Sequence, residues 1–332
     1  MRFLALLSIF FCFSVNAKAD LSNFKIISAE ILNYQDGDSI LIGDVEIQYG
    51  KYTFKAPKVY VDTIDGKPGS ARFIEGATLS SESLDITAPV MEVSIADSIF
   101  KCFSNDSGIV ETRLYSKGSK EPIALSSWYQ EFNLNTGFAK AKARELLKSE
   151  DTYANNFDRV KFISKDLNVN SNSLEMETEE NSVAYVDFIG DVVAKDSKQR
   201  TEAEELFYFP AQDLVKAEGN VKILYVNDTK PSYIFSDLVI YEREDSIFSA
   251  MSTGTDSQAE VHSENTKGHA RQIILTMDKD DKPERAILTG NAYAQYGDKS
   301  ILGHEVLMNF KEQTVETLVG RPHTQILKSP SS

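Results

Sequence analysis

The residues of this sequence that could carry chemistry are four histidines, one isolated cysteine and one acidic stretch. The histidines do not show the spacing of a metal site; they are His262, His269, His304 and His323. The acidic stretch 278–284, DKDDKPE, offers oxygen ligands for Ca²⁺. It lacks the spacing of a calcium-binding loop and is more typical of a solvated hairpin turn. No nucleophile elbow, phosphate loop or metal-binding cysteine cluster is present. The sequence therefore indicates a protein that is not an enzyme and uses no cofactor.

Two further features each have a structural and a functional interpretation. Cys102 follows Phe100 and Lys101 in an alternating run, which predicts a small buried apolar residue. As a nucleophile it would have no histidine partner in the first half of the chain. Lys140, Lys142 and Arg144 share one face of an expected strand. We expect them to form a solvated face, and contact with lipid phosphates is the alternative.

The N-terminus has the features of a cleavable signal peptide. Arg2 precedes an apolar stretch at 3–15, and Ala17-Lys18-Ala19 matches a cleavage site, so residues 1–19 are expected to be removed. A membrane anchor is the alternative, but a bilayer span needs roughly 20 apolar residues. Cys12 would leave with the signal peptide, so the mature chain would hold no disulfide within one chain.

Composition limits the class of protein. The chain has 332 residues, 42% of them hydrophobic and 26% charged, which is typical of a globular protein of one large or two ordinary domains. The formal net charge of −15 argues against nucleic-acid binding, because a nucleic-acid-binding face must neutralise phosphates.

A repeated motif organises most of the sequence. An apolar residue, a second residue, Gly-Asp or Gly-Asn and then an alternating run occur in LIGDVEIQY, FIGDVVAKD, AEGNVKILY and LTGNAYAQY, which start at positions 41, 188, 217 and 288. The glycines that precede alternating runs recur about every 30–35 residues; they are Gly43, Gly76, Gly108, Gly137, Gly190, Gly219, Gly254, Gly290 and Gly320. The stretch 155–163, NNFDRVKFI, could supply one more repeat with Asn in place of Gly.

Each repeat has a second motif in phase with the glycine. It is a small residue, then an acid, Pro or His, then any residue and an apolar one; examples begin at Ala56, Ala203, Ser236 and Gly303. Alternation with short turns predicts antiparallel strands, and each repeated glycine is expected to let a long strand bend or bulge from one sheet to another. The stretches 138–151 and 201–207 contain good helix formers, but the phase of the repeat predicts strands there.

The repeats resemble the OstA-like, LptA-type family of periplasmic lipopolysaccharide-transport proteins. The resemblance rests on the Gly-Asn/Asp-Val corner, on the second motif and on Ala-Glu-Gly-Asn-Val at 217–221. It is good over 183–325, recognisable over 40–100 and weak over 100–180. It implies an all-β, elongated, open β-jellyroll of two twisted antiparallel sheets. We expect one segment at 20–150, an OstA-like segment at 151–326 continuous with it, and a disordered tail at 327–332.

The resemblance also implies a function. The protein would be periplasmic and would hold the acyl chains of lipopolysaccharide or a related lipid in an apolar groove between the sheets. It would pair its edge strands with other β-jellyroll proteins of the transport system, and it could form homo-oligomers. The candidate groove residues are the inward positions of the alternating strands: Val45, Ile47, Val192, Ala194, Val221, Ile223, Val239, Ala292, Ala294, Val306, Met308 and Phe310.

Alternation alone leaves two interpretations of these residues open. They are a groove or simply the closed core of a sandwich, and the inward set also includes Tyr49, Tyr225, Phe235 and Tyr241. Small residues such as Ala194, Ala292 and Ala294 would leave room for acyl chains. A closed core would instead favour a non-catalytic structural or adhesive protein that binds other proteins through its edges.

Overall fold

A computed structural model describes most of the chain after the expected signal peptide. The described residues are 24–35, 38–64, 67–106, 108–116, 121–144, 159–165, 167–179, 182–197, 199–226, 231–254, 257–263, 265–279, 282–319 and 323–326. The expected signal peptide (1–19), tail (327–332) and Asn start of an extra repeat (155–156) lie outside them, as does Gly320.

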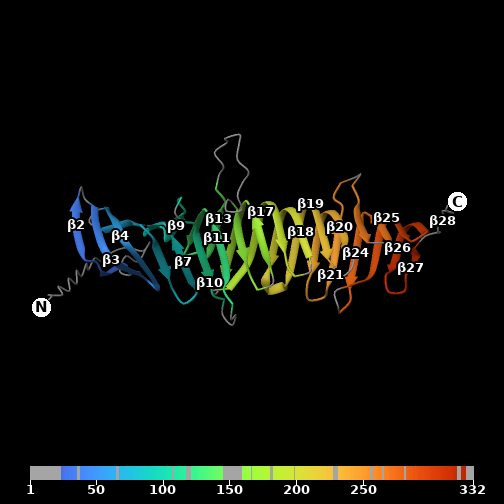
Figure 1. Ribbon diagram of the computed structural model, residues 1–332, viewed down its shortest axis with the longest axis horizontal. Coiled ribbons are helices and arrows are strands. Elements are labelled where there is room, and N and C mark those ends of the chain that lie inside the picture. The colour runs from blue at the N-terminus through green and yellow to red at the C-terminus, as the bar shows by residue number, and fades with distance from the viewer. Residues whose placement is uncertain are drawn as a thin grey trace. The chain divides into compact units, whose positions relative to one another are not determined.

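The prediction of an all-β, jellyroll-like fold is confirmed (Figure 1). The chain divides into two compact units, Met1–Thr112 with Glu131–Asn135, and Arg113–Gln130 with Thr136–Ser332. The strands of the first unit are β1 (Phe24–Ser28), β2 (Ile31–Gln35), β3 (Asp38–Tyr49), β4 (Tyr52–Ile64), β5 (Lys67–Ile74), β6 (Ala77–Ser80), β7 (Leu84–Ala88), β8 (Val90–Ser94) and β9 (Ile99–Phe103).

Two strands, β10 (Val110–Leu114) and β12 (Tyr129–Asn133), contribute residues to both units. The strands of the second unit are β11 (Ile123–Ser127), β13 (Phe138–Lys142), β14 (Val160–Ile163), β15 (Asn168–Ser171), β16 (Ser173–Glu179), β17 (Ser182–Lys195), β18 (Gln199–Phe209), β19 (Leu214–Val226), β20 (Pro231–Glu242), β21 (Ile247–Met251), β22 (Ala259–Ser263), β23 (Thr266–Ala270), β24 (Gln272–Met277), β25 (Pro283–Tyr296), β26 (Lys299–Asn309), β27 (Thr314–Val319) and β28 (His323–Ile326). In the described part of the chain, the single helical element is the 3₁₀ turn η3 (Pro210–Gln212).

Within each unit the strands form two antiparallel ladders. In the first unit, the first ladder runs β2, residues 38–42 of β3, residues 58–64 of β4, β5, β8 and β9. The second ladder runs β1, residues 45–49 of β3, residues 52–56 of β4, β6 and β7. The long strands β3 and β4 therefore belong to both ladders, one half of each strand to each.

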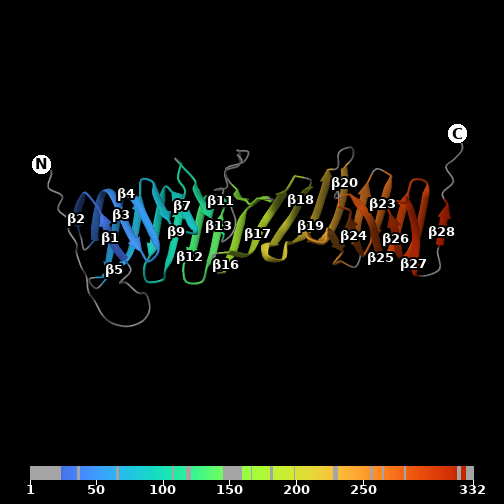
Figure 2. The same ribbon diagram turned by 90° about the horizontal axis from the view of Figure 1, so that it is seen from below.

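The second unit repeats this arrangement with more strands (Figures 1 and 2). Its first ladder contains, in order, β13, β16, the first half of β17, the second half of β18, the first half of β19, the second half of β20, β21 and β24. It ends with the first half of β25, the second half of β26 and β27. The second ladder joins β11, β14, β15, the other halves of β17 to β20, β22, β23, the other halves of β25 and β26, and β28.

Four of the long strands, β3, β17, β19 and β25, cross from one ladder to the other at a Gly-Asp or Gly-Asn step, and β4, β18, β20 and β26 cross opposite such a step. Both residues of the step have positive φ: 80° and 41° at Gly43-Asp44, 79° and 46° at Gly190-Asp191, 75° and 48° at Gly219-Asn220, and 84° and 52° at Gly290-Asn291. At each step the pairing register shifts, so that two residues of the bulged strand oppose one residue of the next strand. Gly adopts this conformation at no steric cost, and Asp and Asn are the next most tolerant residues, which explains the motif.

A side chain from a neighbouring segment covers each of these glycines. A Cβ on Gly219 would lie 2.6 Å from Oε2 and 2.7 Å from Cβ of Glu204. The same Glu204 accepts a hydrogen bond from the Asn220 amide at 2.6 Å. Glu30, Asn172 and Arg271 lie in the same way over Gly43, Gly190 and Gly290. Glu204 belongs to the second sequence motif, whereas Glu30, Asn172 and Arg271 lie at breaks between strands, outside that motif.

Four of the nine repeated glycines do not fit the expectation of a bulge within a strand. Gly137 has φ of 71° but lies between β12 and β13. Gly76 has φ of 98° but lies between β5 and β6, where the chain leaves strand conformation. Gly108 forms an isolated bridge with Asn105, and Gly254 lies between β21 and β22; neither has positive φ. In these repeats the ladders are joined by a break between short strands, so no left-handed residue inside a strand is needed. Of the stretch 138–151, residues 138–142 form the expected strand, β13, and residues 145–151 lie outside the described residues; the strand expected at 201–207 is confirmed as part of β18.

The core lies between the two ladders of each unit. In the first unit, the ring of Phe54 in the second ladder stacks on Phe73 of the first, with centroids 5.2 Å apart. In the second unit, buried residues of both ladders form one apolar cluster that extends from Ala203 to Met308. Inward side chains alternate with outward ones along most strands, as the sequence pattern predicts, whereas nearly all side chains of β1 and β2 are exposed.

We expect Gly219→Val to lower the free energy of unfolding by about 1–3 kcal/mol, because a β-branched residue is strained at positive φ. The new side chain would also collide with Glu204. Urea denaturation followed by circular dichroism measures the change.

The matched control is Gly297→Val. Gly297 also has positive φ, 59°, but nothing lies within 4 Å of a Cβ built there. The control carries the backbone strain without the collision, so it should lose less stability. An unchanged denaturation midpoint for Gly219→Val, or equal losses in both variants, would contradict the role assigned to the corner.

Candidate binding groove

The structure places the candidate groove residues between the ladders. Eleven of the twelve are at most 4% exposed: Val45, Ile47, Val192, Ala194, Val221, Ile223, Val239, Ala292, Ala294, Val306 and Met308. The twelfth, Phe310, is partly buried and packs against the core cluster of the second unit. Val45 and Ile47 lie in the first unit, and the other ten residues lie in the second. The inward face that the alternation predicts is therefore present, and it is apolar on both ladders.

One inward residue was predicted wrongly. Phe235 was expected to point inward with Val239, but it is 36% exposed and Ile234, which is 7% exposed, takes the inward position. The reason is the bulge in β19, since Val221 pairs with Ser236 whereas Glu218 pairs with Leu238. The strand opposite a bulge lacks the extra residue. In β20 the inward positions are therefore even-numbered before the bulge and odd-numbered after it, and a prediction that assumes one continuous alternation places Phe235 inward wrongly.

A narrow slot opens between the ladders near the C-terminal end of the core cluster. On the second ladder it is lined by Ile223, Tyr225, Ser232, Ile234, Val261 and Ser263. On the first ladder it is lined by Phe248, Leu275, Met277, Pro283 and Phe310. We call the outermost of these residues the rim; they are Tyr225, Ser232, Ser263, Met277, Pro283 and Phe310.

The slot is nearly filled by side chains. Its volume is about 20 Å³, which is room for about one water molecule. Small inward residues let the ladders approach closely. A Cβ on Gly268 would lie 2.8 Å from Leu288, 3.2 Å from Met308 and 3.2 Å from Val261. The space that Ala292 and Ala294 were expected to leave for a ligand is thus taken up by larger neighbours.

The rim side of the slot differs from the corner side. At the corners, the bulged strands connect the two ladders covalently. At the rim, each hairpin stays within its own ladder; Tyr225 pairs with Ser232 and Ser263 pairs with Thr266 in the second ladder, and Met277 pairs with Pro283 in the first. These hairpins at the rim do not connect the two ladders.

The sequence analysis missed eight of the eleven slot residues; they are Ser232, Ile234, Phe248, Val261, Ser263, Leu275, Met277 and Pro283. Leu275 and Met277 alternate in the stretch QIILTM, which is a signal that was there to be used. Phe248 lies on the short strand β21, where the repeat is interrupted and the motif gives no phase.

The other candidate chemical residues are dispersed. Cys102 is fully buried, as predicted for a small apolar residue of the core, and burial raises the pKa of its thiol far above its ordinary value. His262 contacts Glu260 at 2.7 Å, and His269 stacks on Tyr293 with centroids 5.0 Å apart. Within the described ranges, no group of three or more His, Cys, Asp or Glu side chains could hold a metal ion.

The basic residues of β13 face outward. Lys140 pairs with Glu175 at 2.7 Å, and the guanidinium of Arg144 lies 4.5 Å from the ring centroid of Trp128. Lys142 is exposed. These side chains form a surface and do not reach the slot. Across the residues that the structure describes, no helix is both long and apolar enough to cross a bilayer.

One carboxyl on the outer face of the first ladder is electrostatically strained. Oδ1 of Asp187 is buried and has no hydrogen-bond partner among the described residues. Burial, and then the charges of Glu205, Glu175 and Glu218, raise the pKa of Asp187 to about 6. At neutral pH the protein therefore carries a carboxylate here whose charge opposes folding.

Comparisons with known proteins were made by family model, by sequence and by structure. No family model matches the chain, and no curated protein matches it by sequence. Among solved structures, the chain is similar to LptH of Pseudomonas aeruginosa, described as the LptA-homologous periplasmic component of the lipopolysaccharide transport device. The match has 12% identity and a TM-score of 0.29, and it covers 49% of this chain and 95% of LptH. At these values the likeness does not say what this chain binds.

We expect Ile223→Glu to lower the free energy of unfolding by about 3–5 kcal/mol, because an unpaired charge would be buried. Ile223 is 3% exposed and lies in the core cluster. Lys222→Glu, one residue away and on the outer face, is the matched control and should change stability little. Chemical denaturation of both variants tests this. Equal, small effects would show that the inward face is accessible to water.

We expect Asp187→Asn to raise the melting temperature at pH 7.5. The pKa of Asp187 in the folded protein, about 6, lies above its ordinary value of 3.8. The folded state therefore binds the proton more tightly, and this stabilisation is present below pH 4 and is lost as the pH rises through about 6. Asp187→Asn carries no charge at this position and does not lose this stability, so the increase in melting temperature seen at pH 7.5 should vanish near pH 4.

The melting temperatures of wild type and Asp187→Asn, measured between pH 4 and pH 7.5, test this prediction. Glu179→Gln, which removes one exposed acid from the same sheet, is the control. An advantage of Asp187→Asn that does not depend on pH would contradict the account of this carboxyl.

Proposed function

We propose that this protein is a periplasmic lipid carrier of the lipopolysaccharide-transport type, exported by a cleavable signal peptide and acting in outer-membrane biogenesis in a Gram-negative cell. It binds acyl chains of lipopolysaccharide or a related lipid between the two ladders of the second unit. It performs no catalysis, and the ligand leaves chemically unchanged.

The observation that carries this proposal is the apolar slot with a rim whose two sides belong to different ladders. Ile223, Ile234 and Val261 on one ladder face Phe248, Leu275 and Met277 on the other. Each methylene that leaves water for such a surface contributes about 0.8 kcal/mol, so an acyl chain gains several kcal/mol by entering. The ladders can separate at the rim, which lets a chain enter or leave sideways rather than through an end.

The small inward residues have a role in this mechanism. Gly268, Ala270, Ala292 and Ala294 line one ladder where larger side chains would fill the space permanently. When the ladders part, Leu288 and Met308 move away from Gly268, and the vacated space is wide enough for a hydrocarbon chain. A core of large side chains from both ladders would interdigitate and could not open in this way.

The N-terminal strands supply the interaction part of the proposal. Ile26 and Ile27 are 47% and 53% exposed, although consecutive strand residues point to opposite faces. Ile31, Leu32 and Tyr34 on β2 are 49%, 49% and 71% exposed. An edge with apolar side chains on both faces favours pairing with an edge strand of another β-jellyroll protein or of a second copy.

The same exposed edge favours the second candidate function, a structural or adhesive protein that binds other proteins through β1 and β2 and keeps its core closed. The two functions differ in whether lipid reaches the slot.

Site-specific photo-cross-linking separates them. Benzoylphenylalanine at Phe310, on the rim, should cross-link to purified lipopolysaccharide and shift the protein on a gel. The same substitution at Phe235, on the outer face of the neighbouring ladder, is the matched control and should give no adduct. Both changes replace one aromatic residue with another, so the fold is retained.

A lipid adduct at Phe310 that exceeds the one at Phe235 by about tenfold or more supports the carrier. No adduct at Phe310, or equal adducts at both positions, contradicts it. If benzoylphenylalanine at Ile27 then captures protein only, the structural alternative is favoured.

A further inference from the structure

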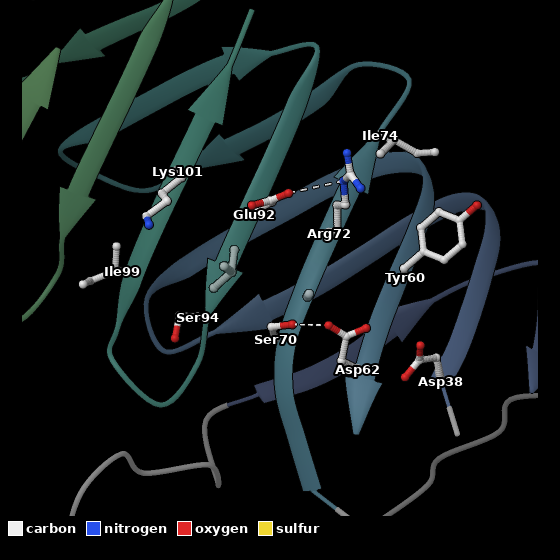
Figure 3. A pocket seen from close by; sticks show the side chains of 12 residues that line it. Asp38, Tyr60, Asp62, Ser70, Arg72, Ile74, Glu92, Ser94, Ile99 and Lys101 are labelled. Carbon is white, nitrogen blue, oxygen red and sulfur yellow. Dashed lines mark hydrogen bonds and ion pairs between the residues drawn. The ribbon is translucent and has the colours of Figure 1, made fainter. Parts of the chain in front are cut away.

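A polar hollow lies on the outer face of the first ladder in the first unit, away from the slot. Its volume is about 680 Å³, within the range of about 300–1,000 Å³ that is usual for sites of small ligands. Residues of β3, β4, β5, β8 and β9 line it, as Figure 3 shows. Nothing in the proposed lipid carriage uses this surface.

The hollow results from side-chain size across neighbouring strands. One cross-strand row contains Tyr60, Arg72, Glu92 and Lys101, and the next contains Asp62, Ser70, Ser94 and Ile99. In the second row the two central strands, β5 and β8, carry serines, whereas the flanking strands carry larger side chains. The serines and the buried Ala71 and Val93 therefore form a low floor between taller walls.

The lining excludes an apolar ligand. Asp38, Asp62 and Glu92 contribute carboxylates, and Arg72 and Lys101 contribute cationic groups. A hydrocarbon lying over these groups would remove their water and give no hydrogen bond in return, which costs several kcal/mol. The opposite charges are interspersed, so the hollow is neither a strong anion site nor a strong cation site.

Existing contacts hold the polar side chains in place. Ser70 Oγ donates a hydrogen bond to Asp62 Oδ2 at 2.5 Å, and Arg72 Nε pairs with Glu92 Oε1 at 3.4 Å (Figure 3). Each contact uses one oxygen of the carboxylate and leaves the second to face a ligand. Acceptors and donors thus alternate along the row at the spacing of adjacent strands, near 4.8 Å.

We propose that this hollow binds a short neutral saccharide. Vicinal hydroxyl groups are donors and acceptors at once, so they suit a surface where carboxylates and a guanidinium alternate. The carboxylates of Asp62 and Glu92 accept from sugar hydroxyls, and Arg72 donates to them. Tyr60 provides the one aromatic ring of the lining, against which the C–H face of a sugar packs.

Isothermal titration of the full mature chain with maltose, cellobiose, lactose and N,N′-diacetylchitobiose tests the proposal. At least one disaccharide should bind, and Tyr60→Ala and Glu92→Ala should each weaken its binding about tenfold or more. Glu46→Ala is the matched control, since Glu46 pairs with Lys55 at 3.1 Å on the outer face of the other ladder. It should leave binding unchanged.

Thermal melts of the three variants establish that they are folded. Absence of binding by all four disaccharides overturns the proposal, as does binding that persists in both Tyr60→Ala and Glu92→Ala. Displacement of the sugar by inorganic phosphate or by ethanolamine would assign the hollow to a charged ligand and also overturn it. None of these results depends on lipid binding, which is measured in the other unit at Phe310.

Discussion

The left-handed Gly-Asp or Gly-Asn pair is the constraint on which the rest of the structure depends. Two consecutive residues at positive φ inside a strand are strained for most side chains, and the repeated motif places at each the residues that tolerate it best. Because of this pair, one strand can leave the first ladder and continue in the second. Without it, β17, β19 and β25 would each belong to one flat sheet, and their inward residues would have no opposing face.

The two ladders are connected by the bulged strands on the corner side, and no hairpin that the structure describes connects them on the rim side. The corners are covered by side chains such as Glu204 and Arg271, whose contacts make them rigid. At the rim, Tyr225 and Phe310 belong to different ladders. Apolar packing of these side chains against the core cluster holds this side closed.

The outer faces follow a different physical rule from the inner ones. Between the ladders, the core residues make mainly apolar contacts, which depend on shape. Outside, the side chains of adjacent strands stand about one strand spacing apart, and charge decides their effect. Where opposite charges alternate, as for Arg72 and Glu92, the result is a hydrated hollow. Where acids meet, as for Asp187 with Glu175 and Glu205, one carboxyl is destabilised. The same sheet geometry gives both outcomes.

The sequence by itself determined that the chain is all-β, where its long strands bend, and that Val221, Ile223, Ala292 and Ala294 point inward. These properties depend on local alternation and on which residues tolerate positive φ. Tertiary structure decided the rest. The inward phase of Ile234 instead of Phe235 depends on which strand of a pair carries the extra residue, and this is a property of pairing. The small volume of the slot depends on the distance between ladders, and the hollow requires Ser70 and Ser94, 24 residues apart in sequence, to be register partners. None of these three properties can be predicted from the sequence of a single strand, because each depends on how two strands or two ladders are placed relative to each other.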